Sequence, residues 1–428
     1  MRNLLFLPLF LFCCWQAEGQ DYLQQANACF EKGDYECAKR NYKLFTEFDG
    51  SRDVSAQIQA ADECFKILIA ADDYFKEKEY EKARDRYQAV LDKNPKDPKA
   101  REQFDECVKI LKDFTTHTET AKKTDIYVTG HDGNAATLWK NGIVQGLTDG
   151  NKSASAESVY VSGNDVYIVG YEANKSNLTI ARLWKNGVSQ NLIDKTYDNS
   201  AWANSIFIAG DDVYVAGNGR IGNAMLWKNG RAQSLTDGSK NAGATSVYVL
   251  GNDVYVAGYE YNTKGGGVAM LWKNGKAQSL TDGSKDARAE SVYVSGNDVY
   301  VAGYDGNAAI LWKNGIAQSI TDGSNTFARA ESVYVLGNDV YVAGSESNEH
   351  SLLVATLWKN GLAQRLTDGS KDAEAKSVYV SGNDIYVAGY ETNSQKNEVA
   401  TLWKNGIVQR LTDGSKDARA TSVFVKIL

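Results

Sequence analysis

A five-residue motif, LWKNG, recurs seven times between residues 138 and 406 of this 428-residue chain. Successive copies start 45, 43, 45, 40, 46 and 45 residues apart. One repeat of this length cannot bury a hydrophobic face by itself, and strand-rich repeats of about 45 residues stack radially around an axis. Each copy places a tryptophan at the same position: Trp139, Trp184, Trp227, Trp272, Trp312, Trp358 and Trp403.

One repeat, which starts at Ser291, contains four short segments typical of strands. The segments SVYV and DVYVAG alternate β-branched and aromatic residues, and the turn residues Gly296 and Asn297 separate them. The segments AAILWK and IAQSI are separated by Asn314 and Gly315, a dipeptide that favours a two-residue hairpin because both positions tolerate positive φ. Each repeat is therefore predicted to form a four-stranded antiparallel meander.

The two strand series are offset along the chain. Second strands begin at Asp125, Asp165, Asp212, Asp253, Asp298, Asp339 and Asp384. First strands begin at Ser158, Ser205, Ser246, Ser291, Ser332, Ser377 and Ser422. The first unit lacks its own first strand and the chain ends with a spare one, so we predict that residues 422–425 pair with the strand at Asp125. This closure would remove exposed sheet edges.

Residues 124–428 thus resemble a β-propeller, and we predict seven blades with the C-terminal strand closing the ring. The resemblance is one of architecture. No blade carries a Gly-His and Trp-Asp pair or a double-glycine signature. Fold alone does not settle function.

The segment from Asp21 to about Leu111 has apolar residues at helical spacing. It resembles tetratricopeptide repeats through two sets of small and aromatic residues, Ala26, Cys29, Tyr35, Ala38, Tyr42 and Phe45, then Ala71, Tyr74, Tyr80, Ala83, Tyr87, Val90 and Pro95. The two sets are 45 residues apart, whereas the family repeats every 34 or so, which predicts a longer first helix in the second unit. We predict a tetratricopeptide-like (TPR-like) all-α domain over residues 20–112 and a linker over 113–123. The resemblance implies peptide or protein binding on a concave face; a spacer role is the alternative.

The first nineteen residues resemble a secretory signal peptide. Arg2 precedes an apolar run of eleven residues, and Ala17 and Gly19 precede a cut before Gln20. We expect an exported protein that is periplasmic, at the cell surface or secreted. A lipid anchor through Cys13 or Cys14 is less favoured, because a small residue precedes neither.

Four cysteines remain beyond residue 19. Cys29 and Cys37 flank a helical turn and are the expected disulfide pair, while Cys64 and Cys107 occupy equivalent positions in two DEC segments. The alternative is that all four are small buried packing residues.

An Ala-x-Ala pattern recurs just before the first strands, and its middle residue varies. If first strands line a central channel, these side chains ring its mouth and the arginines among them suit an acidic or aromatic ligand. The alternative is drift of solvated loop positions after duplication. The candidate binding residues are Trp202, Arg288, Arg329, Glu374 and Arg419, with Ser155 and Gly243 at the equivalent positions.

Other chemistries have less support in the sequence. The blade tryptophans are expected to pack between blades, with sugar stacking as the alternative. The repeated Thr-Asp-Gly, as at Thr281, could suggest calcium ligands, but an Asx turn explains the same residues, so we expect no metal site and no cofactor. The three histidines lie in no nucleophile or metal motif, and we expect no catalytic residues. A net charge of −7 gives no reason to expect nucleic acid.

These observations favour a non-enzymatic scaffold or adaptor of the bacterial cell envelope. Protein partners would bind the TPR-like groove and the loop-rich face of the propeller. A carbohydrate-binding, lectin-like propeller is the alternative, with a glycan as its ligand. Contact with a membrane is expected only through a lipid anchor or a partner.

Overall fold

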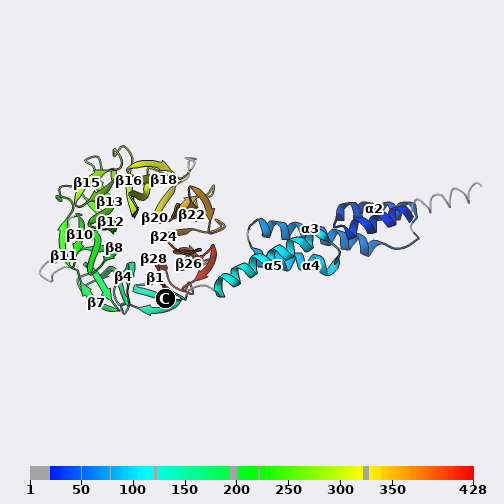
Figure 1. Ribbon diagram of the computed structural model, residues 1–428, viewed down its shortest axis with the longest axis horizontal. Helices are drawn as coiled ribbons and strands as arrows, with labels where there is room; N and C mark the ends of the chain where they lie inside the picture. Colours follow the sequence, from blue (N-terminus) through cyan, green and yellow to red (C-terminus); the bar gives the residue numbers. More distant parts are fainter. Residues whose placement is uncertain are drawn as a thin grey trace, which may run out of the picture. The chain divides into compact units, whose positions relative to one another are not determined.

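The computed structural model describes residues 20–49, 51–77, 79–119, 123–192, 200–219, 222–321 and 327–428 (Figure 1). The chain divides into two compact units, residues 1–122 and 123–428. The signal peptide expected at residues 1–19 lies outside the described residues. No helix of the described part is long and apolar enough to cross a membrane.

The described residues of the first unit form five helices. A helix over residues 20–31 is followed by α2 (Tyr35–Phe48), α3 (Ser55–Lys76), α4 (Tyr80–Lys93) and α5 (Pro98–Glu119). Its core combines fully buried alanines, among them Ala38 and Ala83, with the buried rings of Tyr35 and Tyr87. Small side chains let neighbouring helices approach closely while the tyrosines fill the space between them.

The boundary of this unit differs from the expected linker. Helix α5 continues to Glu119, so most of the segment 113–123, predicted as a linker without regular structure, is helical. Polar residues without an apolar period do not exclude a helix, because threonine, lysine and glutamate all tolerate helical geometry on a solvated face.

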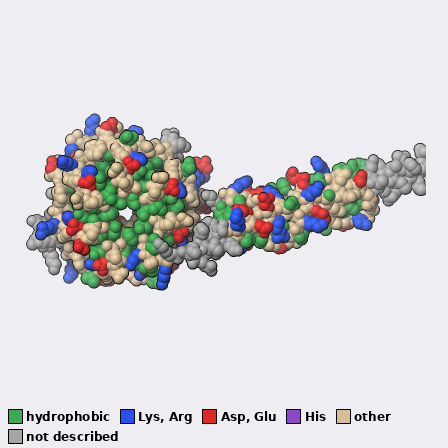
Figure 2. All heavy atoms as spheres, viewed as in Figure 1, with side chains coloured by type: hydrophobic (Ala, Val, Ile, Leu, Met, Phe, Trp, Pro, Cys, Tyr) green, Lys and Arg blue, Asp and Glu red, His purple; other side chains and the backbone are tan. Residues whose placement is uncertain are grey.

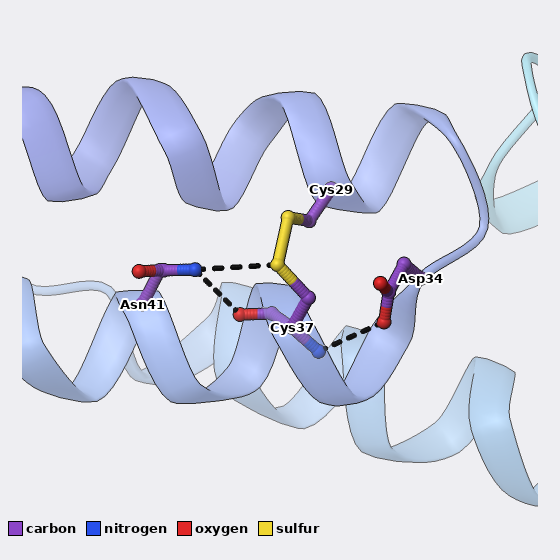
Figure 3. Close-up of a disulfide and its surroundings, with 4 residues drawn as sticks. All are labelled: Cys29, Asp34, Cys37 and Asn41. Carbon is purple, nitrogen blue, oxygen red and sulfur yellow. Dashed lines mark hydrogen bonds between the residues drawn. A yellow bond between two sulfur atoms is a disulfide. The ribbon is translucent and has the colours of Figure 1, made fainter.

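A disulfide joins the first two helices (Figure 3). Cys29 and Cys37 are bonded with their Cα atoms 5.8 Å apart. Asp34 caps α2 by accepting a hydrogen bond from the Cys37 backbone N–H at 3.0 Å, and Asn41 donates to the Cys37 carbonyl at 3.0 Å. Cys64 and Cys107 are buried thiols, and burial raises the pKa of each.

The second unit is a seven-bladed β-propeller in which every blade is a four-stranded antiparallel sheet (Figure 1). The innermost strands neighbour one another around the axis and are β4 (Ala154–Ser162), β8 (Trp202–Ala209), β12 (Ala242–Leu250), β16 (Ala287–Ser295), β20 (Ala328–Leu336), β24 (Ala373–Ser381) and β28 (Ala418–Ile427). The second strands are β1 (Thr124–Asp132), β5 (Asp165–Ala173), β9 (Asp212–Asn218), β13 (Asp253–Tyr261), β17 (Asp298–Asp305), β21 (Asp339–Ser347) and β25 (Asp384–Thr392).

The two outer strands of each blade form the LWKNG hairpin. The third strands are β2 (Ala135–Lys140), β6 (Thr179–Lys185), β10 (Ala224–Lys228), β14 (Gly267–Lys273), β18 (Ala308–Lys313), β22 (Leu353–Lys359) and β26 (Glu398–Lys404). The outermost strands are β3 (Ile143–Gly146), β7 (Val188–Asn191), β11 (Arg231–Ser234), β15 (Lys276–Ser279), β19 (Ile316–Ser319), β23 (Leu362–Arg365) and β27 (Ile407–Arg410). We number the blades in chain order: blade 1 combines β28 with β1, β2 and β3, and blade 7 consists of β24 to β27.

The C-terminal strand closes the ring, as the offset of the strand series predicted. Strand β28 pairs antiparallel with β1, with Phe424 opposite Tyr127 and Ser422 opposite Thr129. A serine on each inner strand also accepts a hydrogen bond from a backbone N–H of the following blade. At the closure Ser422 Oγ lies 3.4 Å from Val159 N, and the other six junctions repeat the bond at 3.1 to 3.3 Å. The ring is therefore closed in blade 1, where β28 and β1 are held together by non-covalent contacts.

The LWKNG motif is a building unit. In blade 1, Asn141 and Gly142 have φ values of 51° and 78°, as a two-residue hairpin turn requires. The Asn141 side chain donates to Asp125 at 2.9 Å and accepts from the Ile126 backbone N–H at 2.8 Å. Lys140 pairs with Asp125 at 2.9 Å and lies 5.1 Å from the centroid of the neighbouring Tyr127 ring. The lysine–aspartate pair recurs in all seven blades at 2.7 to 2.9 Å.

The seven tryptophans lie between blades. Trp272 of blade 4, for example, packs with Tyr214 and Leu226 of blade 3. All seven side chains are at most 2% exposed. Burying a tryptophan removes about 150–250 Å² from water, worth about 4–6 kcal/mol as an upper bound. Six of the seven indole N–H groups have no acceptor in the described part of the chain, which offsets about 1–3 kcal/mol of that gain.

Candidate functional site

The inner strands surround a central channel and supply side chains to it at three levels. We call the first the channel rim: Ser155, Trp202, Gly243, Arg288, Arg329, Glu374 and Arg419. The second, the polar belt, follows two residues later: Glu157, Asn204, Thr245, Glu290, Glu331, Lys376 and Thr421. The third, the aromatic collar, comprises Tyr160, Phe207, Tyr248, Tyr293, Tyr334, Tyr379 and Phe424.

A β-bulge separates the rim from the collar. In blade 5, Ala289 pairs with Gly303 and Ser291 with the adjacent Ala302, so Glu290 is the extra, unpaired residue. Gly303 is required there, because a Cβ atom on it would lie 2.0 Å from the Arg288 carbonyl oxygen. The same irregularity occurs in every inner strand. The bulge frees one position per blade for the polar belt.

The aromatic collar is a closed ring of seven side chains. Neighbouring ring centroids are 4.8 to 5.1 Å apart at all seven junctions, including Phe424 to Tyr160 across the closure. Seven equal sides of this length place the centroids about 5.6 Å from the axis, which leaves an opening of at most about 8 Å after the rings' own thickness is removed. Figure 2 shows hydrophobic side chains gathered around the hollow centre of the ring. Burial raises the pKa of the Tyr293 hydroxyl to about 12.

At the rim, arginines stack on aromatic side chains of the preceding blade. The Arg288 guanidinium lies 4.1 Å from the Tyr259 centroid, and that of Arg329 lies 3.5 Å from the Tyr304 centroid. Arg419 is 4.7 Å from the Tyr390 centroid. Such cation–π contacts contribute about 0.5–2 kcal/mol each, more as the cation loses water. They hold three flexible side chains in fixed orientations.

The arginines differ in their counter-ions. Arg419 forms an ion pair with Glu398. Within the described residues, Arg288 and Arg329 have no carboxylate within 4 Å. Both are half-buried. Desolvation lowers the pKa of Arg329, whereas for Arg288 desolvation is outweighed by the nearby tyrosines and Glu290, which raise the pKa. Because no carboxylate of the described chain contacts either guanidinium directly, both groups are available to an external anion.

Hydrogen bonds fix the two arginines only in part. Arg288 Nη2 donates to the Tyr261 hydroxyl at 2.6 Å, whereas its buried Nε has no acceptor among the residues that the structure describes. Arg329 Nη1 donates to the backbone carbonyls of Gly306 and Ala328, at 3.1 and 3.0 Å. Within the described part of the chain, several donors of each guanidinium group have no acceptor.

Charges of the polar belt lie beside these arginines. Lys376 pairs with Glu331 at 3.1 Å and with Glu374 at 2.7 Å. Burial alone would lower the pKa of Lys376, but these two carboxylates outweigh it and raise that pKa. Burial, reinforced by the charge of Glu331, raises the pKa of Glu290 to about 7. Burial also raises the pKa of Glu157.

The structure places all the candidate binding residues at one level of the channel but groups only some of them. Arg288 and Arg329 are in the adjacent blades 5 and 6, and both approach Tyr304. Arg419 and Glu374 are in blades 1 and 7. Trp202 is half-buried, Ser155 is only 2% exposed, and the Tyr259 ring fills the space beside Gly243.

Sequence reasoning missed the second-strand residues opposite the rim. The residue after each Ala-Gly or equivalent pair on the second strand lies across from a rim residue: His131, Tyr171, Asn218, Tyr259, Tyr304, Ser345 and Tyr390. The recurring Tyr after Ala-Gly was the available signal. It also missed the aromatic collar, although the third residue of every SVYV-type strand is aromatic.

The helical unit carries a groove of about 450 Å³ between α2 and α3. Its α2 wall includes Lys39, Arg40, Lys43 and Leu44, and the ion pair between Lys39 and Asp62 spans it. The groove offers mixed charge around a small apolar surface.

The Thr-Asp-Gly segments form turns. Asp282 accepts a hydrogen bond from the Ser284 backbone N–H at 2.8 Å, and Thr281 accepts from the Ala269 backbone N–H at 3.1 Å. This is an Asx turn tied to the neighbouring strand. The described residues contain no group of three or more His, Cys, Asp or Glu side chains that could hold a metal ion.

No protein family model matches this chain, and no curated protein matches it. The β-propeller domain of the Trilobed protease from Pyrococcus furiosus is similar in structure, with a TM-score of 0.44 and 12% identity over 68% of this chain and 95% of that domain. The extracellular domain of a putative one component system from B. thetaiotaomicron has a TM-score of 0.36 and 12% identity over 62% of this chain. A puromycin-hydrolyzing peptidase of Mycobacterium tuberculosis has a TM-score of 0.39 and 10% identity over 59% of this chain.

The matched region spans 37% of the B. thetaiotaomicron domain and 52% of the peptidase. At these identities the likenesses concern the fold, and they carry no information on what this chain binds.

Proposed function

We propose that this protein is a non-enzymatic adaptor of the bacterial cell envelope that holds partner proteins on its helical unit and on the rim of its propeller. The observation that carries the proposal is the pair Arg288 and Arg329. Each is stacked on an aromatic ring and half-buried without a carboxylate partner in the described chain. Side chains oriented in this way and left without a counter-ion among the described residues suit recognition of an acidic group.

The helical unit supports the same function. Its alanine and tyrosine packing agrees with a TPR-like interpretation, and the groove between α2 and α3 is a second surface for a partner. The disulfide between Cys29 and Cys37 favours an oxidising compartment, which agrees with export after removal of residues 1–19. Mass spectrometry of the mature chain tests the export proposal, with an N-terminus at Gln20 as the expected result.

Quantitative affinity capture with the full chain tests the adaptor proposal. Two variants are compared with the unmodified protein: Arg40→Glu with Lys43→Glu in the groove, and Arg288→Gln with Arg329→Gln at the rim. If the protein is an adaptor, we expect two sets of partners. The groove variant should lose one set and retain the other, and the rim variant should do the reverse. If both variants recover the same proteins in the same amounts as the unmodified chain, the proposal is wrong.

A carbohydrate-binding propeller remains the second candidate, and Trp202 is the observation that favours it. Unlike the seven blade tryptophans, which are too buried to stack on a sugar, Trp202 is half-buried at the rim. Glycan-array binding that is lost in Trp202→Ala and kept in Arg288→Gln with Arg329→Gln would support this candidate over the adaptor.

A further inference from the structure

The rim and the polar belt form a vestibule that ends at the aromatic collar. From Arg288 to Tyr293 the inner strand advances five residues, or about 15 Å. At the collar, the seven rings narrow the opening to at most about 8 Å. A ligand that enters from the rim therefore meets charged and polar groups first and an aromatic floor last.

One sector of the rim combines aromatic rings and guanidinium groups across blades 4 to 6. The groups are Tyr259 of blade 4, Arg288 and Tyr304 of blade 5, and Arg329 of blade 6 with Phe327, which precedes β20. The Arg288 guanidinium lies 4.1 Å from Tyr259, and Arg329 lies 3.5 and 3.8 Å from the centroids of Tyr304 and Phe327. Arg288 is directly opposite Tyr304 in the strand register. We call these five residues the arginine ladder.

We propose that the arginine ladder binds carboxylate side chains of an acidic polypeptide segment on a protein partner. This inference rests on the proposed adaptor function and names the chemistry that its rim recognises. A guanidinium presents a planar fork of donors that matches a carboxylate in two parallel hydrogen bonds. The ladder holds two such forks around Tyr304 without a carboxylate of the described chain to occupy them.

A polypeptide suits the ladder better than an acidic sugar. A sugar ring needs an open aromatic face to stack on, and the arginines cover one face of Tyr259 and of Tyr304. In the belt of blades 3 and 4, Asn204 and Thr245 donate to backbone carbonyls of the next inner strand at 2.8 and 2.7 Å, the kind of contact that an extended polypeptide also offers. Glu290 and Glu331 occupy the belt positions of blades 5 and 6.

Several carboxylates face the ladder and oppose an incoming anion. The charge of Glu290 acts on both arginines, and the charges of Glu331 and Asp286 act on Arg329. Lys376 neutralises Glu331 by a direct ion pair. Among the residues that the structure describes, Glu290 has no ion-pair partner within 4 Å, and its pKa of about 7 means that it loses its charge as the pH falls through neutrality. Peptide glutamates stay ionised down to a pH of about 5, so affinity should rise between pH 8 and pH 6.

The experiment measures binding of a fluorescent decaglutamate peptide to the full-length protein by anisotropy at low salt. A decaglutamine peptide of the same length tests whether charge is needed. An oligoglucuronate of matched charge tests whether the carboxylates of an acidic sugar bind as well as those of a peptide. The variant is Arg288→Gln with Arg329→Gln. The matched control removes two exposed arginines from the outermost strands, Arg231→Gln with Arg365→Gln, and so lowers the net charge equally.

We expect decaglutamate to bind and decaglutamine and oligoglucuronate to bind more weakly. The rim variant should weaken decaglutamate binding at least about tenfold, because two charge-assisted contacts are lost, and the control should change it less than about twofold. If the glutamine pair does not fold, Arg288→Lys with Arg329→Lys keeps the charge, lacks the fork, and should still weaken binding several-fold. In the unmodified protein, affinity should fall between pH 6 and pH 8, and Glu290→Gln should remove this dependence.

Equal losses in the rim variant and the control would overturn the inference, as would equal binding of decaglutamine, stronger binding of oligoglucuronate, or no binding of decaglutamate. These outcomes leave the adaptor proposal standing if affinity capture still separates groove and rim partners. Failure of that capture experiment instead removes the proposed function itself.

Discussion

The non-covalent joint of blade 1 gives the sharpest prediction about stability. Val423 and Val425 on β28 are 4% and 3% exposed, and Val292 and Val294 occupy the same positions in blade 5 with the same exposures. Replacing either pair by alanine removes four buried methyl groups and leaves similar cavities. Each pair should therefore cost about 3–5 kcal/mol of global stability.

The two variants should differ locally. Strand β16 leads into β17 through a short turn, whereas β28 meets β1 only by hydrogen bonds and side-chain contacts. Losing the valines of β28 should therefore let β28 and β1 separate without unfolding the other blades. For 306 residues, a global loss of about 4 kcal/mol corresponds to a decrease in Tm of about 6 °C.

Thermal unfolding and native-state hydrogen exchange test both parts. We expect similar decreases in Tm for Val423→Ala with Val425→Ala and for Val292→Ala with Val294→Ala. Exchange should accelerate in β1 and β28 of the first variant well beyond the change in β16 and β17 of the second. If β1 amides in the first variant exchange no faster than β17 amides in the second, the closure is not the weak joint and the reasoning fails.

Three further predictions concern single sites. In urea titrations, Trp312→Ala should lower the free energy of unfolding by about 3–5 kcal/mol. Trp312→Phe should cost less, because it keeps a large ring and removes an indole N–H that has no acceptor among the described residues. Equal costs for the two variants would contradict inter-blade packing as the main role of this side chain. The pKa of Glu290 is higher in the folded chain than in the unfolded chain, so its burial destabilises the fold increasingly as the pH rises from about 5 to 7. Glu290→Gln should therefore stabilise the protein more at pH 8 than at pH 5. An equal effect at both pH values would refute this prediction. Cys37→Ser breaks the Cys29–Cys37 bond and should lower the free energy of unfolding of the helical unit by about 2–3 kcal/mol, because the bond closes a loop of eight residues. Thermal melting followed by far-UV circular dichroism measures this loss. An unchanged melting curve would show that packing alone holds the first helix.

Much of the propeller could be predicted because each signal is local. The Asn-Gly dipeptide specifies its own hairpin, the alternation in SVYV specifies a strand, and the count of strands requires β28 to complete blade 1. The helical unit was predicted as helical for the same reason, although α5 continues into the segment expected as a linker.

The rim could be placed only in part. The Ala-x-Ala pattern located Arg288 and Arg329 at the mouth of the channel. It could not show that each stacks on a tyrosine of the preceding blade, since that contact joins residues about 25 to 29 positions apart across an interface. The bulge at Glu290 was equally hidden, because a single extra residue does not disturb the alternation on either side of it.

The inner strands place the side chains that face the channel and the side chains that pack between blades at different positions. Val292, Trp312 and their equivalents hold neighbouring blades together from positions that face away from the axis. The rim and belt residues lie on the inner strands, as Val292 does, but do not belong to that hydrophobic core. Substitutions at the fourteen rim and belt positions could therefore change the preferred ligand, one blade at a time, while the scaffold tolerates each change.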